Sequence, residues 1–333
     1  AGVKQAPARQ AVIGAGLPDS VPATTLTKMC GSGMKATMLV HDMLLAGSCN
    51  VGLAGGMESM SNAPYVLTRA RGGYRLGHGQ AFDHMFLDGL EDAYEGKLMG
   101  YFADLAAAEF GIARERQDAY AAESVRRAQH AVASGAFREE IVPVAIPGRQ
   151  GEKVISDDET PGTCDIAKIP KLKPAFTKDG SITPANASSI SDGAAALVMM
   201  RESEALRRGI TPLARILSHA THAQQPGRFP TAPAPAIRRA LERAGWCVGD
   251  VDLFEINEAF AVVTLLAMDE LGLPAEVVNV NGGACAMGHP VGATGARILV
   301  TLIHALRARG LRRGLASLCI GGGEATAMAI EVL

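Results

Sequence analysis

Hydrophobic positions in the first sixty residues change spacing from one segment to the next. Residues 24–27, Thr-Thr-Leu-Thr, are typical of an extended segment, and apolar residues then recur at helical spacing from 34 to 45. The turn Gly31-Ser32-Gly33 separates the two, and Gly47 follows the helix. An apolar run at 51–54 ends in two glycines. This order predicts a strand, a helix and a second strand.

The last sixty residues repeat that order. Residues 277–280 are extended in character, a glycine-rich turn runs to Gly295, and helical spacing follows from 296 to 309. A buried strand at 315–320 then ends in three glycines. Such a repeat, with a period far above that of a solenoid, predicts an α/β protein of two similar halves that face each other.

The chain between these two segments has a different character. Residues 61–175 are richer in charge, Tyr, His and Met, with one strongly polar helix at 114–134 and a Pro-, Gly- and Asp-rich tract at 147–174. This composition predicts an inserted, surface-exposed subdomain. After it, a buried strand at 251–256 leads into Asn257 and a further helix.

Composition narrows the class of protein. Of 333 residues, 48% are hydrophobic and 20% charged, with a net charge of −2, so neither a disordered chain nor a nucleic-acid binder is expected. No stretch reaches the roughly 18 uncharged apolar residues that span a bilayer, so no membrane partner is expected. The six cysteines form no CxxC pair, which argues against disulfides or structural zinc and favours the cytoplasm: Cys30, Cys49, Cys164, Cys247, Cys285 and Cys319.

Reactive side chains follow several of the predicted turns. Cys30 comes at the start of an apolar helix, where the helix dipole and free N–H groups favour a thiolate; it is a candidate nucleophile, or else a small buried thiol. His289, on a loop of small residues, is a candidate base or oxyanion donor, although a lone His is more often structural.

Two further candidates end strands. Cys319 precedes Gly321-Gly322-Gly323, a pattern suited to a thiol acid/base beside an oxyanion hole, or to a buried Cys before an ordinary turn. Asn257 could orient a water or cap a helix. By contrast, His219 and His222 form an i, i+3 pair with no further ligand in the pattern, so no metal site is predicted.

Together these segments resemble the thiolase family over the whole chain. The motifs that carry the resemblance are Lys28-Met29-Cys30-Gly31-Ser32-Gly33, Asn257-Glu258-Ala259-Phe260, Gly288-His289-Pro290 and Cys319-Ile320-Gly321-Gly322-Gly323. Supporting matches are Gly55-Gly56-Met57-Glu58-Ser59-Met60, Lys173-Pro174-Ala175-Phe176 and Asn186-Ala187-Ser188.

The resemblance implies acyl transfer between CoA thioesters, in which a thioester on Cys30 leads either to cleavage of 3-oxoacyl-CoA or to condensation of two acetyl-CoA. His289 would activate Cys30 and stabilise an enolate, Cys319 would move the α-proton, and Asn257 would hold a water beside His289. The N–H groups of Cys30 and Gly321 would form a second oxyanion hole. Coenzyme A would be a substrate, with no permanently bound cofactor and no metal. The implied CoA contacts are Ser188, Phe176, Met99, Phe260, Ala259 and Lys168.

The resemblance also implies a layered αβαβα fold of duplicated halves with an inserted loop subdomain. The N-terminal half would comprise 1–60 and 190–208, the CoA-binding insertion 61–189, and the C-terminal half 209–333. A homodimer or homotetramer that acts in fatty acid metabolism is implied. Family chains carry a further β-α-β unit before the present start, so an incomplete N-terminal half with exposed apolar surface is expected.

The chain departs from the family pattern at three places that would contact CoA or substrate, and two other functions remain possible for it. Leu98 stands where members that make acetoacetyl-CoA have His, residues 160–163 lack an expected Arg, and residues 225–229 alter a loop at the acyl pocket. A 3-oxoacyl synthase would share the fold but would use two histidines and no second cysteine. A non-catalytic acyl-CoA or lipid carrier is the remaining alternative.

Overall fold

A four-stranded sheet forms the centre of the computed structural model, which describes residues 1–149 and 151–333. Its strand order is β7-β10-β9-β8, with β8 parallel to β9 and the other neighbours antiparallel. The strands are β7 (Ala214–Ala223), β8 (Leu253–Ile256), β9 (Arg313–Ile320) and β10 (Glu324–Val332). Nearly every residue of β8, β9 and β10 is buried, as continuous apolar runs require when helices cover both faces.

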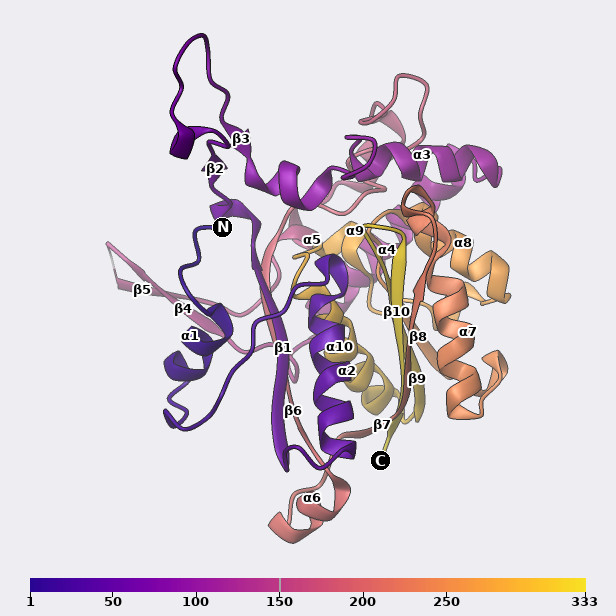
Figure 1. Ribbon diagram of the computed structural model, residues 1–333. Coiled ribbons are helices and arrows are strands. Elements are labelled where there is room, and N and C mark those ends of the chain that lie inside the picture. The colour runs from indigo at the N-terminus through magenta and orange to yellow at the C-terminus, as the bar shows by residue number, and fades with distance from the viewer. Residues whose placement is uncertain (150) are drawn as a thin grey trace.

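Helices cover the two faces of this sheet (Figure 1). On one face, α7 (Pro233–Ala244) packs through Ile237 and α8 (Ala261–Leu271) packs through Met268 in the cluster of Phe254 and Leu315. On the other face lie α2 (Ser32–Leu45) and α10 (Thr294–Arg309). Each large apolar side chain buried in these clusters contributes about 1.5–3 kcal/mol.

A second, two-stranded sheet covers the far side of α2 and α10. Antiparallel β1 (Val51–Ser59) and β6 (Asp192–Met200) pair along their whole length, so segments on either side of the insertion belong to one sheet. The outer face of this pair is exposed at Leu53, Met57 and Val198, which are 48%, 47% and 66% accessible.

The layers therefore run sheet, helices, sheet, helices (Figure 1). Within the described residues the fifth, outer helical layer is absent, because α1 (Pro7–Gly14) buries none of its residues. The two halves are unequal in consequence, with two strands in one sheet and four in the other. The two halves thus share the order of helix and strand that the sequence predicts, but their sheets differ in the number of strands.

Residues between β1 and β6, where the sequence predicts an insertion, form several short elements and two long helices. The long helices α3 (Met99–Glu109) and α4 (Arg114–Ser134) pack on α8, and α4 also packs on α9 (Ala284–Met287). The other elements of this segment are β2 (Tyr65–Val66), β3 (Phe82–Asp83), β4 (Val144–Gly148), β5 (Gly151–Ile155), α5 (Thr160–Thr163) and η5 (Ile166–Lys171). The remaining helix, α6 (Glu202–Arg208), follows β6. The short turns are η1 (Met29–Gly31), η2 (Met60–Asn62), η3 (Ala70–Gly72), η4 (Phe86–Leu90), η6 (Pro226–Thr231), η7 (Val248–Asp250) and η8 (Ala275–Val277).

Two predicted strands do not form ladders. Residues 24–27 have no strand partner among the described residues, although Thr25 accepts a hydrogen bond from the N–H of Ala8. Residues 277–280 contribute a single bridge, from Val278 to Phe254 of β8. Extended propensity makes a strand only where a neighbour supplies hydrogen bonds, so these two expectations were wrong. No described helix combines the length and the apolarity needed to cross a bilayer.

Candidate active site

Cys30 lies in the tight turn η1 that leads into α2. Met29 has a left-handed backbone with φ of 48°, which costs a non-glycine residue about 1–3 kcal/mol. Ser32 holds this conformation: its hydroxyl donates to the Met29 carbonyl at 2.8 Å and accepts from the Lys28 N–H at 2.9 Å. The turn presents a partly buried thiol at the N-terminus of α2, a helix that is buried on one side.

Close contact between α2 and α10 brings the two halves of the site together. A Cβ on Gly33 would lie 2.7 Å from the amide nitrogen of Ala296, and one on Gly295 would collide with Met34. Only glycines allow the starts of the two helices to approach so closely. Because Cys30 precedes α2 and His289 precedes α10, this contact brings both loops to one end of the molecule.

His289 is buried and held as one tautomer. Its Nδ1 lies 2.6 Å from the Thr294 hydroxyl, which donates to the Pro290 carbonyl at 3.0 Å. Since that hydroxyl proton is already used, Nδ1–H donates to Thr294 and Nε2 carries the lone pair. Burial lowers the pKa of His289 to about 3, with a smaller effect from Arg297, so the ring is neutral.

Asn257 ends β8 beside this ring. Its Nδ2 lies 3.5 Å from Nε2 of His289, and its buried Oδ1 has no hydrogen-bond partner among the described residues. A buried amide oxygen without a partner indicates a site for a water or a ligand. The capping interpretation of Asn257 was wrong, because Phe260 is the N-cap of α8.

Cys319 and Gly321 complete the cluster from the end of β9. Cys319 is 1% exposed, and the charge of Cys30 is among the causes that raise its pKa, behind burial, so the two thiols are neighbours. Burial raises the pKa of Cys30 to about 11, while hydrogen bonds from the N–H groups of Gly321 and of Cys30 itself lower it in part. The sequence expectation of a resting thiolate was therefore wrong, because desolvation outweighs the helix terminus.

Four of the six expected CoA contacts, Met99, Phe176, Ala259 and Phe260, belong to one apolar cluster that also contains Cys319, and the fifth, Ser188, is hydrogen-bonded to Ala259. Phe176 packs edge-to-face on Phe260 with ring centroids 6.0 Å apart. The N–H and hydroxyl of Ser188 both donate to the Ala259 carbonyl, at 3.0 and 3.1 Å. Met99 reaches the glycine turn, since a Cβ on Gly321 would lie 3.7 Å from its Sδ.

Lys168, the sixth expected contact, lies elsewhere. It belongs to η5, its side chain is 74% exposed, and its Nζ pairs with Asp165 Oδ2 at 3.2 Å. It is not among the residues of the apolar cluster.

Family models match nearly all of the chain. A thiolase N-terminal domain model matches residues 1–203 and a thiolase C-terminal domain model matches residues 210–332. The chain belongs to the thiolase family. The acetyl-CoA acetyltransferase of Escherichia coli is 51% identical to this thiolase over 100% of the chain and 85% of the relative, and that of Cupriavidus necator is 49% identical over 99% and 85%.

Solved structures agree with the family models. The Bacillus anthracis acetyl-CoA acetyltransferase has a TM-score of 0.97 to this thiolase at 44% identity, over 100% of this chain and 84% of the other. A thiolase from Ascaris suum in complex with coenzyme A has a TM-score of 0.93 at 42% identity, over 100% and 85%. The layered α/β architecture is that of thiolases.

Glu258 is a buried residue of this thiolase whose role the sequence did not reveal. Its carboxylate accepts hydrogen bonds from Tyr120 and Asn279 at 2.9 Å, from Ser124 at 2.7 Å and from the N–H of Cys285 at 2.9 Å. Because each acceptor oxygen has two donors, the charge is compensated, and Glu258 fastens α4 and the loop before His289 to the end of β8. Its position next to Asn257 in the motif was the available signal.

A cavity of about 270 Å³ lies on the insertion side of Glu258, lined also by Tyr120. None of Cys30, His289 and Cys319 lines it. It is therefore separate from the cluster of reactive groups.

Glu58, at the end of β1, was missed as well. Its Oε2 accepts a hydrogen bond from the N–H of Gly292 at 2.9 Å. This bond ties the two-stranded sheet of β1 and β6 to the loop after His289. Its negative charge also contributes to the raised pKa of Cys30. Nothing in its spacing alone marks this contact, which joins residues 234 positions apart.

Proposed function

We propose that this thiolase transfers acetyl groups between CoA thioesters through a thioester on Cys30. In one direction two acetyl-CoA condense to acetoacetyl-CoA, and in the other 3-oxoacyl-CoA is cleaved by CoA. The supporting observations are that the buried thiol of Cys319 lies near Cys30 and that the N–H groups of Cys30 and Gly321 lower the pKa of the Cys30 thiol. In addition, the loop of the neutral His289 precedes α10, which packs against the start of α2.

In the first half-reaction Cys30 attacks the thioester carbonyl of acetyl-CoA. Nε2 of His289 takes the thiol proton, the new bond joins Sγ to the acetyl carbon, and CoA leaves as its thiol with the proton of Cys319, which becomes a thiolate. The N–H groups of Cys30 and Gly321, which lower the pKa of the thiol, would bind the oxyanion. Because the pKa of Cys30 is about 11, proton transfer accompanies attack.

In the second half-reaction Cys319 removes a proton from the methyl carbon of another acetyl-CoA. His289 and a water on the unpartnered Oδ1 of Asn257 stabilise the enolate oxygen. The α-carbon then attacks the acetyl group on Cys30, a carbon–carbon bond forms, and the Cys30 sulfur departs and regains its proton from Nε2 of His289. Splitting the transfer in this way replaces one difficult step by two easier ones.

The apolar cluster beside Cys319 is the proposed pantetheine channel. Met99, Phe176 and Phe260 would pack on the thioester arm, and Ser188 and Ala259 would supply polar groups along it. Lys168 is proposed as a contact to a CoA phosphate, since it is one of two exposed lysines of η5 and its Nζ pairs with a partly exposed carboxylate.

Two rival functions are less well supported. A 3-oxoacyl synthase would use two histidines and no second cysteine, whereas this chain has Cys319 and the pair Asn257-Glu258. A carrier would need no hydrogen-bonded nucleophile beside a second buried thiol.

A homodimer or homotetramer in the cytoplasm with a role in fatty acid metabolism is also proposed. Six free cysteines suit a reducing compartment, and the exposed outer face of β1 and β6 suits assembly. Light scattering after gel filtration tests the assembly.

The activity is tested with purified protein, acetoacetyl-CoA and CoA, by following acetyl-CoA formation. We expect turnover by the unmodified chain and by Cys247→Ser, whose cysteine is exposed and belongs to none of the motifs. Cys30→Ser should lose it. Equal rates for Cys30→Ser and the unmodified chain would refute the proposal.

A further inference from the structure

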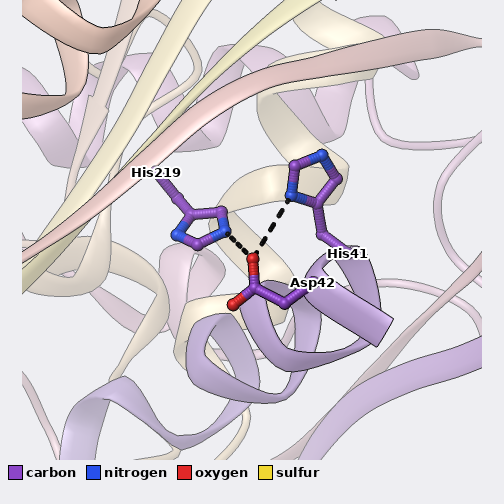
Figure 2. A group of neighbouring side chains, drawn as sticks. All are labelled: His41, Asp42 and His219. Carbon is purple, nitrogen blue, oxygen red and sulfur yellow. Dashed lines mark hydrogen bonds and ion pairs between the residues drawn. The ribbon is translucent and has the colours of Figure 1, made fainter. Parts of the chain in front are cut away.

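Two histidines and an aspartate meet at the end of α2 opposite to Cys30. His41 and Asp42 lie in the last turns of α2, and His219 lies on β7 (Figure 2). One ligand atom of each lies within 4.8 Å of the other two. The Asp42 carboxylate points between the two rings, whose centroids are 5.2 Å apart (Figure 2).

An irregularity in β7 turns His219 toward α2. Ser218 faces α7, where its hydroxyl donates to the Ala240 carbonyl, so the next residue faces the other way. The register with β10 shifts between Ile216 and Ser218, which leaves Leu217 as an extra residue. Ile216 therefore packs on the α2 side and His219 shares that face, as bulges commonly re-aim side chains.

The distances suit a small divalent cation. Ligands of a tetrahedral zinc ion at about 2.1 Å lie about 3.4 Å from one another. Nε2 of His219 lies 3.1 Å from Asp42 Oδ1, and Nδ1 of His41 lies 4.0 Å from the same oxygen. A small side-chain rotation would bring the three ligand atoms to the separation of about 3.4 Å that a tetrahedral zinc ion requires.

Within the part of the chain that the structure describes, Nδ1 of His41 forms no hydrogen bond that would compete with a metal ion. It is buried and lacks a hydrogen-bond partner among the described residues. Burial is the largest cause that lowers the pKa of both rings, so both are neutral near pH 7. His219 donates its Nε2–H to the Asp42 carboxylate, and transfer of that proton to Nδ1 would free the Nε2 lone pair for a metal ion. Asp42 is 53% exposed, which leaves an open side for entry and for a water ligand.

We propose that His41, Asp42 and His219 bind one divalent cation of the zinc class, with water as the fourth ligand. The bound ion would tie the end of α2 to the edge strand β7. Lys35 and Arg243 lie close enough to oppose positive charge at His219, so we expect weaker binding than at a closed structural zinc site. The sequence predicted no metal here because two ligands lie more than 170 positions from the third.

The test is titration of the chelator-treated full chain with Co²⁺, whose visible absorption reports tetrahedral coordination. We expect one equivalent bound by the unmodified chain and by the control His222→Gln. His222 lies on the same strand, and its Nε2 bonds Gln224. His219→Gln and Asp42→Asn should weaken binding at least tenfold. Asp42→Asn changes an exposed side chain, so it keeps the test valid if His219→Gln fails to fold.

Thermal unfolding with Zn²⁺ supplies a second readout. Saturating Zn²⁺ should raise the Tm of the unmodified chain and of His222→Gln by about 3 °C, and that of Asp42→Asn by less than 1 °C. No visible bands in the unmodified chain would overturn the proposal. So would equal Co²⁺ affinity in Asp42→Asn, which would assign the metal to other groups such as the thiols of Cys30 and Cys319.

Discussion

Replacement of Thr294 by valine tests whether the tautomer of His289 matters for catalysis. Thr294 is fully buried, and its hydroxyl both accepts from Nδ1–H of His289 and donates to the Pro290 carbonyl. Valine has nearly the same shape, so the change removes these two hydrogen bonds with little change in packing. A buried polar group left without its partner costs about 1–3 kcal/mol.

If this cost of about 1–3 kcal/mol destabilises the reactive orientation of the His289 ring, the activation free energy rises by the same amount. The value of kcat then falls roughly 5- to 150-fold, because each 1.36 kcal/mol corresponds to a tenfold change in rate. Without the Thr294 hydroxyl as acceptor for Nδ1–H, no hydrogen bond favours the tautomer of His289 that has its lone pair on Nε2. KM for acetoacetyl-CoA should change little, because Thr294 is not among the residues of the apolar cluster beside Cys319.

The assay is steady-state cleavage of acetoacetyl-CoA by CoA. Thr294→Ser keeps the hydroxyl and should restore kcat to within about threefold of the unmodified chain, which separates loss of the hydrogen bond from a general loss of structure. A valine variant with unchanged kcat and a normal unfolding transition would refute the argument that Thr294 orients His289.

Three further predictions follow from the same geometry. Cys319→Ser should still form the acetyl thioester on Cys30 in a single turnover but lose condensation by at least 100-fold, as measured by product formation from acetyl-CoA; unimpaired condensation would contradict its role. Alkylation of Cys30 by iodoacetamide should rise with pH through 9 and on toward about 11, because burial raises the pKa of this thiol and His289 is neutral; a plateau reached near pH 7 would show a resting thiolate instead. Burial raises the pKa of Glu255 to about 8, whereas the same carboxyl in the unfolded chain has a pKa of about 4.5. Between these two pH values the folded state binds a proton that the unfolded state has released, so the free energy of unfolding should fall as pH rises from about 4.5 to about 8. The fall should be less steep in Glu255→Gln. Denaturant titrations at pH 5 and pH 8 measure that slope, and equal slopes in the two chains would contradict it.

Much of the local structure could be predicted because it depends on neighbours in sequence. The helix at 114–134 has the predicted bounds, and α2 and α10 begin within two residues of the predicted starts at 34 and 296. Glycine stops and apolar spacing carry this information within a few residues. Residues 24–27 failed because a strand also needs a partner, which local pattern does not supply.

The candidate site could be predicted as a set of residues but not as an electrostatic environment. Cys30, His289 and Cys319 were identified from their motifs, each at the end of a strand or the start of a helix. The pKa of Cys30 depends instead on how completely β9 and α10 cover it, and the sequence position at a helix N-terminus suggested the opposite direction.

Contacts across the chain were the least predictable. The Glu58 carboxylate meets the loop of Gly292, and Asp42 meets His219, over separations of 234 and 177 residues. The second contact also depends on the extra residue Leu217 in β7, which reverses the face that His219 occupies. No alternation read from the sequence alone would place that histidine beside α2.

The central claim is that Cys30 carries the acyl group, and mass spectrometry tests it most directly. The full chain is mixed briefly with acetoacetyl-CoA, quenched with acid and digested, and the peptide that contains Cys30 is compared with the peptides of the other five cysteines. We predict one acetyl group, on Cys30, that is lost when CoA is added before the quench. An acetyl group on Cys319 or on another cysteine, or no adduct in a folded and CoA-binding protein, would contradict the account.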